Sequence, residues 1–182
     1  ERDFSGVHHH LPPYCKAGSP PIEIHWSIVD PHIPVDIPLA ELWQWARPFE
    51  VASAPALVLS PEHLLLHLCL HGCYYNRFYR GLRLLADVFF TVQKYQQEID
   101  WQLLQTLALQ WGLRKPVFLT LYLTRELFHA SFPESLLPSL QPSDFTPPVA
   151  AEARERVFSD DDLSMNCAVL WGAGGLGSKL RR

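Results

Sequence analysis

The chain has 182 residues, of which 48% are hydrophobic and 19% are charged, and its formal net charge is −4. This composition excludes an intrinsically disordered chain, which combines low hydrophobicity with high net charge, and the mildly acidic balance gives no strong signal for nucleic-acid binding. No apolar run approaches the roughly 20 residues that span a bilayer. The four cysteines do not form a dense disulfide framework. The sequence therefore predicts a soluble cytoplasmic protein.

The first predicted element is a strand over residues 22–28, which follows a loop-like segment rich in proline. Apolar side chains occupy every second position, namely Ile22, Ile24, Trp26 and Ile28. This period of two predicts that the apolar side chains face a core, while Glu23 and His25 point together to the opposite face of the strand.

Helical patterns dominate the rest of the sequence. Caps and breakers predict five helices, over residues 38–48, from residue 60 onward, and over residues 80–95, 100–112 and 116–132. Ser60 and Asp100 are the expected N-caps, and the helix after Ser60 is apolar nearly all round, which is typical of a buried central helix. A short charged helix is expected near residues 149–158. The predicted fold class is α+β, mainly α, with one short N-terminal strand followed by a bundle of about five helices.

Glu23 is the first candidate functional residue. A carboxylate on the polar face of an apolar strand is well placed to hold a metal ion, because the strand fixes the direction of the side chain. The alternative is a half-exposed strand whose outer face carries ordinary polar residues.

Three histidines, His63, His67 and His71, follow one another at intervals of four residues along the predicted central helix. Such a stripe places imidazoles on neighbouring turns of one face. Two of them could bind zinc, but the site would need a third ligand, and the His-Glu-x-x-His signature is absent. The alternative is a stripe along a groove that forms hydrogen bonds to backbone, carboxylates or a ligand.

A charged group opens the helix that follows. Arg83 and Asp87 are four residues apart and could form an ion pair. Alternatively, Arg80 or Arg83 could contact a phosphate through the planar guanidinium. Near the end of the sequence, the glycine-rich run 172–178 lacks the Lys-Ser/Thr order of a phosphate-binding loop, and we expect it to be a non-functional tail.

Taken together, five segments resemble the uncharacterised nucleotidyltransferase family, which belongs to the polymerase-beta-like nucleotidyltransferases. The resemblance covers roughly residues 8–140. Its segments are HLPPY at residues 10–14, IEIHW at 22–26, LSPEHLLLHL at 59–68, GLRLLAD at 81–87 and IDW at 99–101.

The resemblance implies a nucleotidyltransferase core followed by helices. In that superfamily a Gly-Ser turn positions the triphosphate, an Asp-x-Asp pair binds Mg²⁺, and a third carboxylate completes the site. Glu23 matches this third carboxylate, so the resemblance implies that it is a catalytic and metal-binding residue. His67, His71, Arg83 and Asp87 match helical positions that flank the nucleotide cleft. With His25 and Arg80, they form the predicted substrate-binding set.

The chain departs from the family pattern before Glu23. Only 22 residues precede it, and they contain neither a Gly-Ser turn followed by Asp-x-Asp nor an initiating methionine. The acidic run Asp160-Asp161-Asp162 follows the helices and does not replace that pair in chain order. We therefore expect a C-terminal fragment that is catalytically inactive alone, because one carboxylate does not hold two Mg²⁺ ions.

The predicted organisation is a core remnant over residues 1–35, a helical domain over 36–140, and a linker with a glycine-rich tail over 141–182. The expected function is that of part of an enzyme transferring a nucleotidyl group from a nucleoside triphosphate to an unknown acceptor, with magnesium. The alternative is a non-catalytic helical module that binds a ligand or a protein. A third possibility is a metal protein based on histidines.

Overall fold

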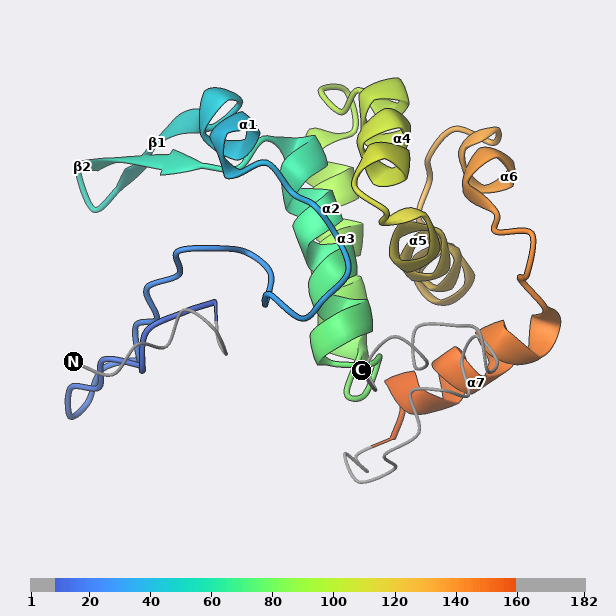
Figure 1. Cartoon of the computed structure of the whole chain (residues 1–182), viewed down its shortest axis with the longest axis horizontal. Coiled ribbons are helices and arrows are strands. Elements are labelled where there is room, and N and C mark those ends of the chain that lie inside the picture. The colour runs from blue at the N-terminus through green and yellow to red at the C-terminus, as the bar shows by residue number, and fades with distance from the viewer. Residues whose placement is uncertain (1–8, 160–182) are drawn as a thin grey trace.

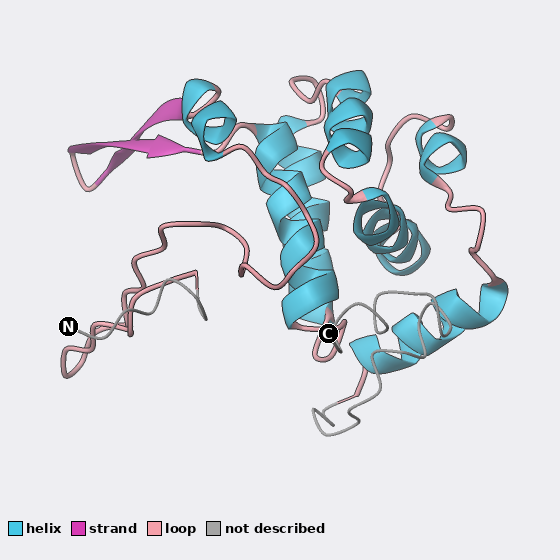
Figure 2. Ribbon diagram, in the orientation of Figure 1, coloured by secondary structure: helices cyan, strands magenta, loops and turns pink. Residues whose placement is uncertain are grey.

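The computed structural model describes residues 9–159 (Figures 1 and 2). Helices dominate, and the only regular sheet among these residues is one two-stranded antiparallel hairpin. The α+β, mainly α, class is thus confirmed. The elements in chain order are α1 (Leu39–Gln44), β1 (Arg47–Val51), β2 (Ala54–Val58), α2 (Pro61–Leu70), the π-helix η1 (His71–Tyr75), α3 (Leu82–Tyr95), α4 (Trp101–Gln110), α5 (Arg114–Phe128), α6 (Leu136–Leu140) and α7 (Pro147–Val157).

Helix α2 is the central helix, as the sequence predicted. It contacts α3, α4 and α5, and α2 and α3 lie side by side in the middle of Figure 1. Leu65, Leu66 and Leu70 of α2 are buried in the main core. The Ser60 hydroxyl accepts a hydrogen bond from the backbone N–H of His63 at 3.4 Å, which confirms the predicted cap. The predicted cap at Asp100 is also confirmed, since its carboxylate accepts from the N–H of Leu103 at 2.9 Å.

A second core cluster lies between α3, α5 and α7. Phe78, Leu85 and Leu119 are fully or almost fully buried against Ala153 and Val157 of α7. The predicted charged helix near residues 149–158 therefore exists, and its apolar side packs on the bundle. Helix α6 was not predicted, because Pro138 lies within it and Pro133 and Pro142 lie on either side. Its buried Leu residues pack against α5.

The strand predicted over residues 22–28 is wrong in its detail. This segment forms only isolated antiparallel bridges to the preceding chain, His10 with His25 and Tyr14 with Ile22. Ile22 and Ile24 do not face a core, since they are 65% and 51% exposed, whereas Ile28 at the end of the segment is partly buried against the main core. The physical reason is that only the end of the segment, from Trp26 onward, lies against another element, helix α1, whereas the side chains of Ile22 and Ile24 stay more than half exposed.

The hairpin β1–β2 was not predicted. Its two-residue turn consists of Ala52 and Ser53, both in the left-handed region with φ of 48° and 67°. This is the geometry of a type I′ turn, for which Asn-Gly or Asp-Gly is the usual sequence signal. Each strand also contains a proline, Pro48 or Pro55, and proline is a sequence signal against a strand. The helix expected over residues 38–48 consequently ends early, at Gln44.

Two cysteines lie in the core as thiols. Cys69 and Cys73 are buried and form no disulfide, and burial raises the pKa of the Cys69 thiol to about 12. Cys15 is free and exposed. None of the helices in the described part of the chain has the length and apolar character needed to cross a membrane. Cys167, Asp160-Asp161-Asp162 and the glycine-rich run 172–178 lie outside the described residues, and the predicted domain boundaries stay a prediction.

We expect replacement of a core leucine to reveal how strongly the bundle depends on α5. Leu121 is fully buried, so Leu121→Ala should lower the free energy of unfolding by about 3 kcal/mol, because it removes apolar contacts and leaves a cavity. The matched control is Leu109→Ala in α4, whose side chain is 45% exposed. Urea denaturation followed by circular dichroism measures both variants. Equal losses in the two would contradict this assignment of the core.

Candidate functional site: a polar pocket beside a cluster of histidines

A pocket of about 650 Å³ opens where α2 ends and α3 begins. We call it the polar pocket. The volume lies within the roughly 300–1,000 Å³ typical of small-molecule sites. Its lining residues are His67, Leu68, His71, Tyr75, Asn76, Tyr79, Arg80, Arg83, Leu84 and Asp87.

The π-helix η1 shapes the rear of the polar pocket. It continues α2 without a break and brings His71 and Tyr75 to the pocket wall. Short π-helical turns of this kind are frequent at functional sites. Gly72 allows α3 to approach closely, because a Cβ atom at this position would lie 2.0 Å from the Cδ2 atom of Leu84.

The loop between η1 and α3 presents the arginines. Arg77, Phe78 and Arg80 all adopt left-handed backbone conformations, with φ of 51°, 63° and 51°. Phe78 is completely buried and anchors this loop. Gly81 follows because a Cβ atom there would lie only 2.6 Å from the carbonyl oxygen of Phe78. Non-glycine residues in this region are uncommon and concentrate at functional sites.

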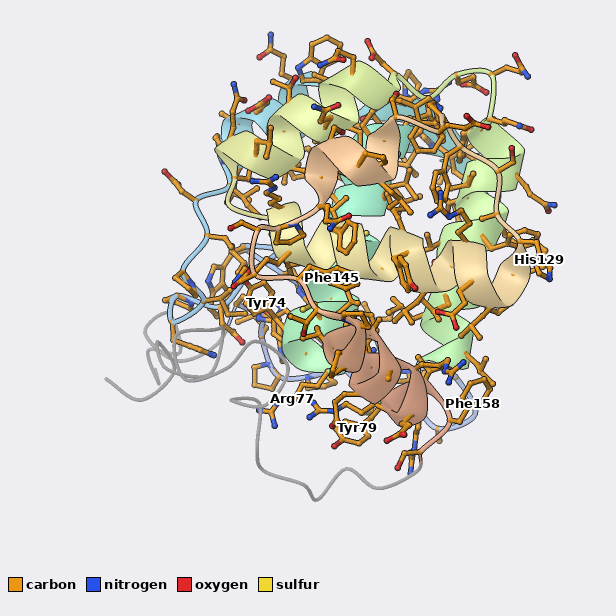
Figure 3. All side chains as sticks on the ribbon, turned by 90° about the vertical axis from the view of Figure 1, so that its right-hand side faces the viewer. Tyr74, Arg77, Tyr79, His129, Phe145 and Phe158 are labelled. Carbon is orange, nitrogen blue, oxygen red and sulfur yellow. The ribbon has the colours of Figure 1, made fainter. Side chains whose placement is uncertain are left out.

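The far side of the same loop is held by α7. Tyr79 lies next to α7 (Figure 3), and the guanidinium carbon of Arg156 is 5.3 Å from the centre of its ring. The backbone N–H of Arg80 donates to the carbonyl of Ser159 at 3.3 Å. The end of α7 therefore supports the loop that carries Arg80.

The charged residues of α3 do not neutralise one another. Arg83 and Asp87 both line the polar pocket, yet within the described part of the chain they form no ion pair. The predicted structural pair is thus not formed, and the guanidinium of Arg83 is exposed at the pocket. The lining carries the guanidinium groups of Arg80 and Arg83 and the carboxylate of Asp87, and guanidinium groups bind anions.

A cluster of histidines adjoins the polar pocket. It consists of His9, His10, His25, His67 and His71. The His9 ring lies 5.0 Å from His10 and 4.9 Å from His25, and the His67 and His71 rings are 6.0 Å apart. Tyr75 connects the two groups, because its ring is 5.1 Å from His9 and 5.1 Å from His71.

A buried contact joins the N-terminal segment to η1. The Nδ1 atom of His9 lies 2.6 Å from a carboxylate oxygen of Asp30. The backbone N–H of Asp30 in turn donates to the hydroxyl of Tyr75 at 2.8 Å. Burial raises the pKa of the Tyr75 hydroxyl to about 12. Tyr75 therefore stays neutral and holds residues 9–30 against the pocket wall.

His67 and His71, the two histidines of the polar pocket, are uncharged near pH 7. Burial, reinforced by the positive charges that His71, His25 and His9 would carry, lowers the pKa of His67 to about 4. Burial also lowers the pKa of His71. The charges of His9 and His25 act in the same direction on His71, and the charge of Glu23 acts in the opposite direction. Their Nδ1 and Nε2 atoms can thus donate or accept hydrogen bonds without charge. The buried Nδ1 of His67 has no partner in the described structure.

The predicted histidine stripe is divided between two roles. His63 does not reach the polar pocket. Its Nδ1 atom lies 2.9 Å from the Ser60 hydroxyl, and its ring stacks on Trp111 at 5.4 Å. His63 therefore belongs to the N-terminal cap of α2, whereas His67 and His71 belong to the pocket.

Glu23 lies beside the histidine cluster, outside the polar pocket. Its Oε2 atom is 3.4 Å from the Nε2 atom of His25, and its charge reaches His71. No three His, Cys, Asp or Glu side chains among residues 9–159 are arranged to hold a metal ion. The described residues therefore form neither a complete Mg²⁺ site around Glu23 nor a zinc site along the histidine stripe.

The structure brings most of the predicted site residues together. His67, His71, Arg80, Arg83 and Asp87 line one pocket, and Glu23 and His25 lie next to it through the histidine cluster. Sequence reasoning missed Tyr75 and His9. Tyr75 continues the four-residue spacing of His67 and His71, and this spacing was the signal that could have found it.

One comparison with known proteins assigns the chain to a family. The sequence model of the family described as uncharacterised nucleotidyltransferase matches residues 3–129. This chain belongs to that family. No curated protein and no solved structure matches the chain.

The buried histidine predicts how stability depends on pH. Between pH 6.5 and 4 the unfolded chain binds a proton at His67 that the folded chain does not bind. The free energy of unfolding should therefore fall as the pH falls through this range, by on the order of 3 kcal/mol from this residue. His67→Leu should remove that part of the slope.

Urea denaturation at several pH values measures this effect. The matched control is Asn76→Ala, which alters the same pocket without removing a titrating group and should keep the slope of the natural chain. If the free energy of unfolding of His67→Leu fell with pH as steeply as that of the natural chain, burial of His67 would not be the cause of the pH dependence.

Proposed function

We propose that this chain binds a nucleoside triphosphate in the polar pocket and serves an enzyme that transfers the nucleotidyl group to an acceptor. The observation that carries the proposal is the exposed Arg83 beside Arg80 in the polar pocket of a nucleotidyltransferase-family chain. Guanidinium groups form bidentate, charge-assisted hydrogen bonds to phosphate oxygens. The proposed phosphate ligands are therefore these two arginines.

The other residues of the polar pocket serve recognition in this proposal. His67 and His71 are neutral hydrogen-bonding groups, and they donate N–H groups to phosphate oxygens without adding charge. Asp87 stands one turn beyond Arg83 and accepts hydrogen bonds from ribose hydroxyls or from a base. His25 lies at the border of the pocket, where the acceptor would approach Glu23.

The proposed reaction is an in-line substitution at the α-phosphorus. A hydroxyl or amine of the acceptor forms the new bond to this phosphorus, and the bond to the bridging β-phosphate oxygen breaks. Pyrophosphate leaves with the bonding electron pair, and the proton of the acceptor passes to a base. The arginines would hold the triphosphate so that its leaving group points away from the acceptor.

Magnesium belongs to the proposal, with Glu23 as one of its ligands. Mg²⁺ supplies charge stabilisation to phosphoryl oxygens. Because residues 9–159 contain no group of three or more His, Cys, Asp or Glu side chains arranged to hold a metal ion, we assign no reaction step to the metal. We propose that these residues bind nucleotide without transferring it.

We expect nucleotide binding to depend on Arg83. Isothermal titration calorimetry of the full chain with ATP, GTP, CTP and UTP should detect binding of at least one of them. Arg83→Gln should weaken it by about tenfold or more, because a charge-assisted hydrogen bond is lost. The matched control is Arg47→Gln, which removes an exposed arginine in β1 that pairs with Glu98 at 2.7 Å. Equal affinity in Arg83→Gln and the natural chain would contradict the proposal.

A second candidate function is a non-catalytic helical module that binds a ligand. The observation that favours it is that residues 9–159 hold no group of three or more side chains arranged to bind a metal ion. Titration with inorganic tripolyphosphate distinguishes the two. A nucleotide site should bind at least one nucleoside triphosphate more tightly than tripolyphosphate, because the nucleoside adds contacts. Equal affinities would favour a general anion-binding module.

A further inference from the structure

A second pocket, of about 270 Å³, lies between the N-terminal segment, α1 and the hairpin. We call it the apolar pocket. Its main walls are Trp26, Leu39, Trp43, Leu57 and Val58, and His25 stands at its edge. Trp43 is 69% exposed although its indole faces this hollow. Such an exposed aromatic surface gains free energy when a ligand covers it.

We propose that the apolar pocket binds the uncharged body of the acceptor molecule, a single ring or a short aliphatic group that carries a hydroxyl or an amine. The assignment of this ligand as the acceptor rests on the function proposed above. A transferase must bind two substrates, and the polar pocket has the chemistry for only one of them.

The lining of the apolar pocket selects against charge. It contains no Lys, Arg, Asp or Glu, and its polar side chains are those of His25 and Ser27. A charged group would lose hydration there without gaining a partner of opposite charge. The triphosphate therefore belongs in the polar pocket, where Arg80 and Arg83 lie.

The size of the apolar pocket limits what can enter it. A volume of 270 Å³ corresponds to about nine water molecules at roughly 30 Å³ each. This room suits a body of about nine non-hydrogen atoms. A helix of a partner protein, with a diameter of about 10 Å or more, is too wide to enter.

The two pockets are close neighbours. His25 of the apolar pocket lies 4.9 Å from His9, ring centre to ring centre, and His9 lies 5.1 Å from Tyr75 of the polar pocket. Glu23 also lies beside His25, since its carboxylate is 3.4 Å from the Nε2 atom of His25. A ligand seated against Trp43 would thus present its polar end to His25 and Glu23.

Benzyl alcohol is a suitable probe, because it is an uncharged ring with a hydroxyl and has eight non-hydrogen atoms. Saturation-transfer NMR on the full chain should detect its binding in the absence of nucleotide. Trp43→Ala should weaken this binding by about tenfold, because the main aromatic wall is lost. Trp45→Ala is the matched control, since Trp45 is two residues away and 51% exposed, yet it does not line the apolar pocket. Benzoate, with a carboxylate on the same ring, should bind more weakly than benzyl alcohol.

Absence of binding to the natural chain, or equal binding to all three proteins, would overturn the proposal. A change of molar mass in light scattering on Trp43→Ala would do the same, because it would show that a second copy of the chain covers the apolar pocket. Calorimetry with the nucleotides separates this inference from the proposed function. Trp43→Ala should keep the nucleotide affinity of the natural chain. If no nucleotide bound while benzyl alcohol bound as expected, the proposed function and the acceptor role would both fail, and only a ring-binding site would remain.

Discussion

The enclosure of α2 determines where this protein can place polar groups. Helices α3, α4 and α5 all contact α2, so most of its side chains must be apolar. Its polar side chains lie at two places. Glu62 and His63 form hydrogen bonds at the capped N-terminus, and His67 lies beside the histidine cluster nearer the other end. The continuation of the same helix into η1 brings His71 and Tyr75 next to His67, and the candidate site forms at this end of the buried helix.

The candidate site combines a firm floor with irregular walls. The floor consists of α2, η1 and α3, which are anchored in two core clusters. The walls are residues 9–30 and the loop between η1 and α3, which have few regular backbone hydrogen bonds. Ligand sites are commonly built in this way, with loops positioned by a rigid scaffold. Buried contacts through Tyr75 and Phe78 attach each wall to the floor.

The helical part of the fold could be predicted from the sequence, because its signals are local. Ser60 and Asp100 cap helices through side chains that bond to backbone within three residues. The hairpin could not be predicted, because its turn, Ala52-Ser53, lacks the usual residues for its backbone geometry. For the strand predicted around Ile24, the alternation of apolar and polar residues is a property of the segment itself. It does not show which other elements pack on either face. Burial depends on distant segments, and a local period does not report them.

The candidate site was predicted where the residues share a helix and missed where they meet across the chain. Arg83 and Asp87 belong to one helix and were recognised together, although the ion pair expected between them does not form. His9 and Tyr75 are 66 residues apart, and their rings meet only because the N-terminal segment folds back onto η1. Chain-order resemblance located the helices that form the polar pocket. It did not reveal the apolar pocket, whose walls come from a segment, a helix and a hairpin of unremarkable sequence.

The three left-handed residues of the loop before α3 lower the stability of the fold, and one of them supplies a charged side chain to the polar pocket. Each non-glycine residue in this conformation costs roughly 1–2 kcal/mol relative to the right-handed region, and glycine would relieve most of that cost. Glycine at Arg77 would relax the backbone and leave the lining of the polar pocket intact, whereas glycine at Arg80 would relax it and remove one of the two pocket arginines. Selection for stability and selection for a charged pocket therefore favour different residues at Arg80. At Arg77, three residues earlier, the two do not conflict.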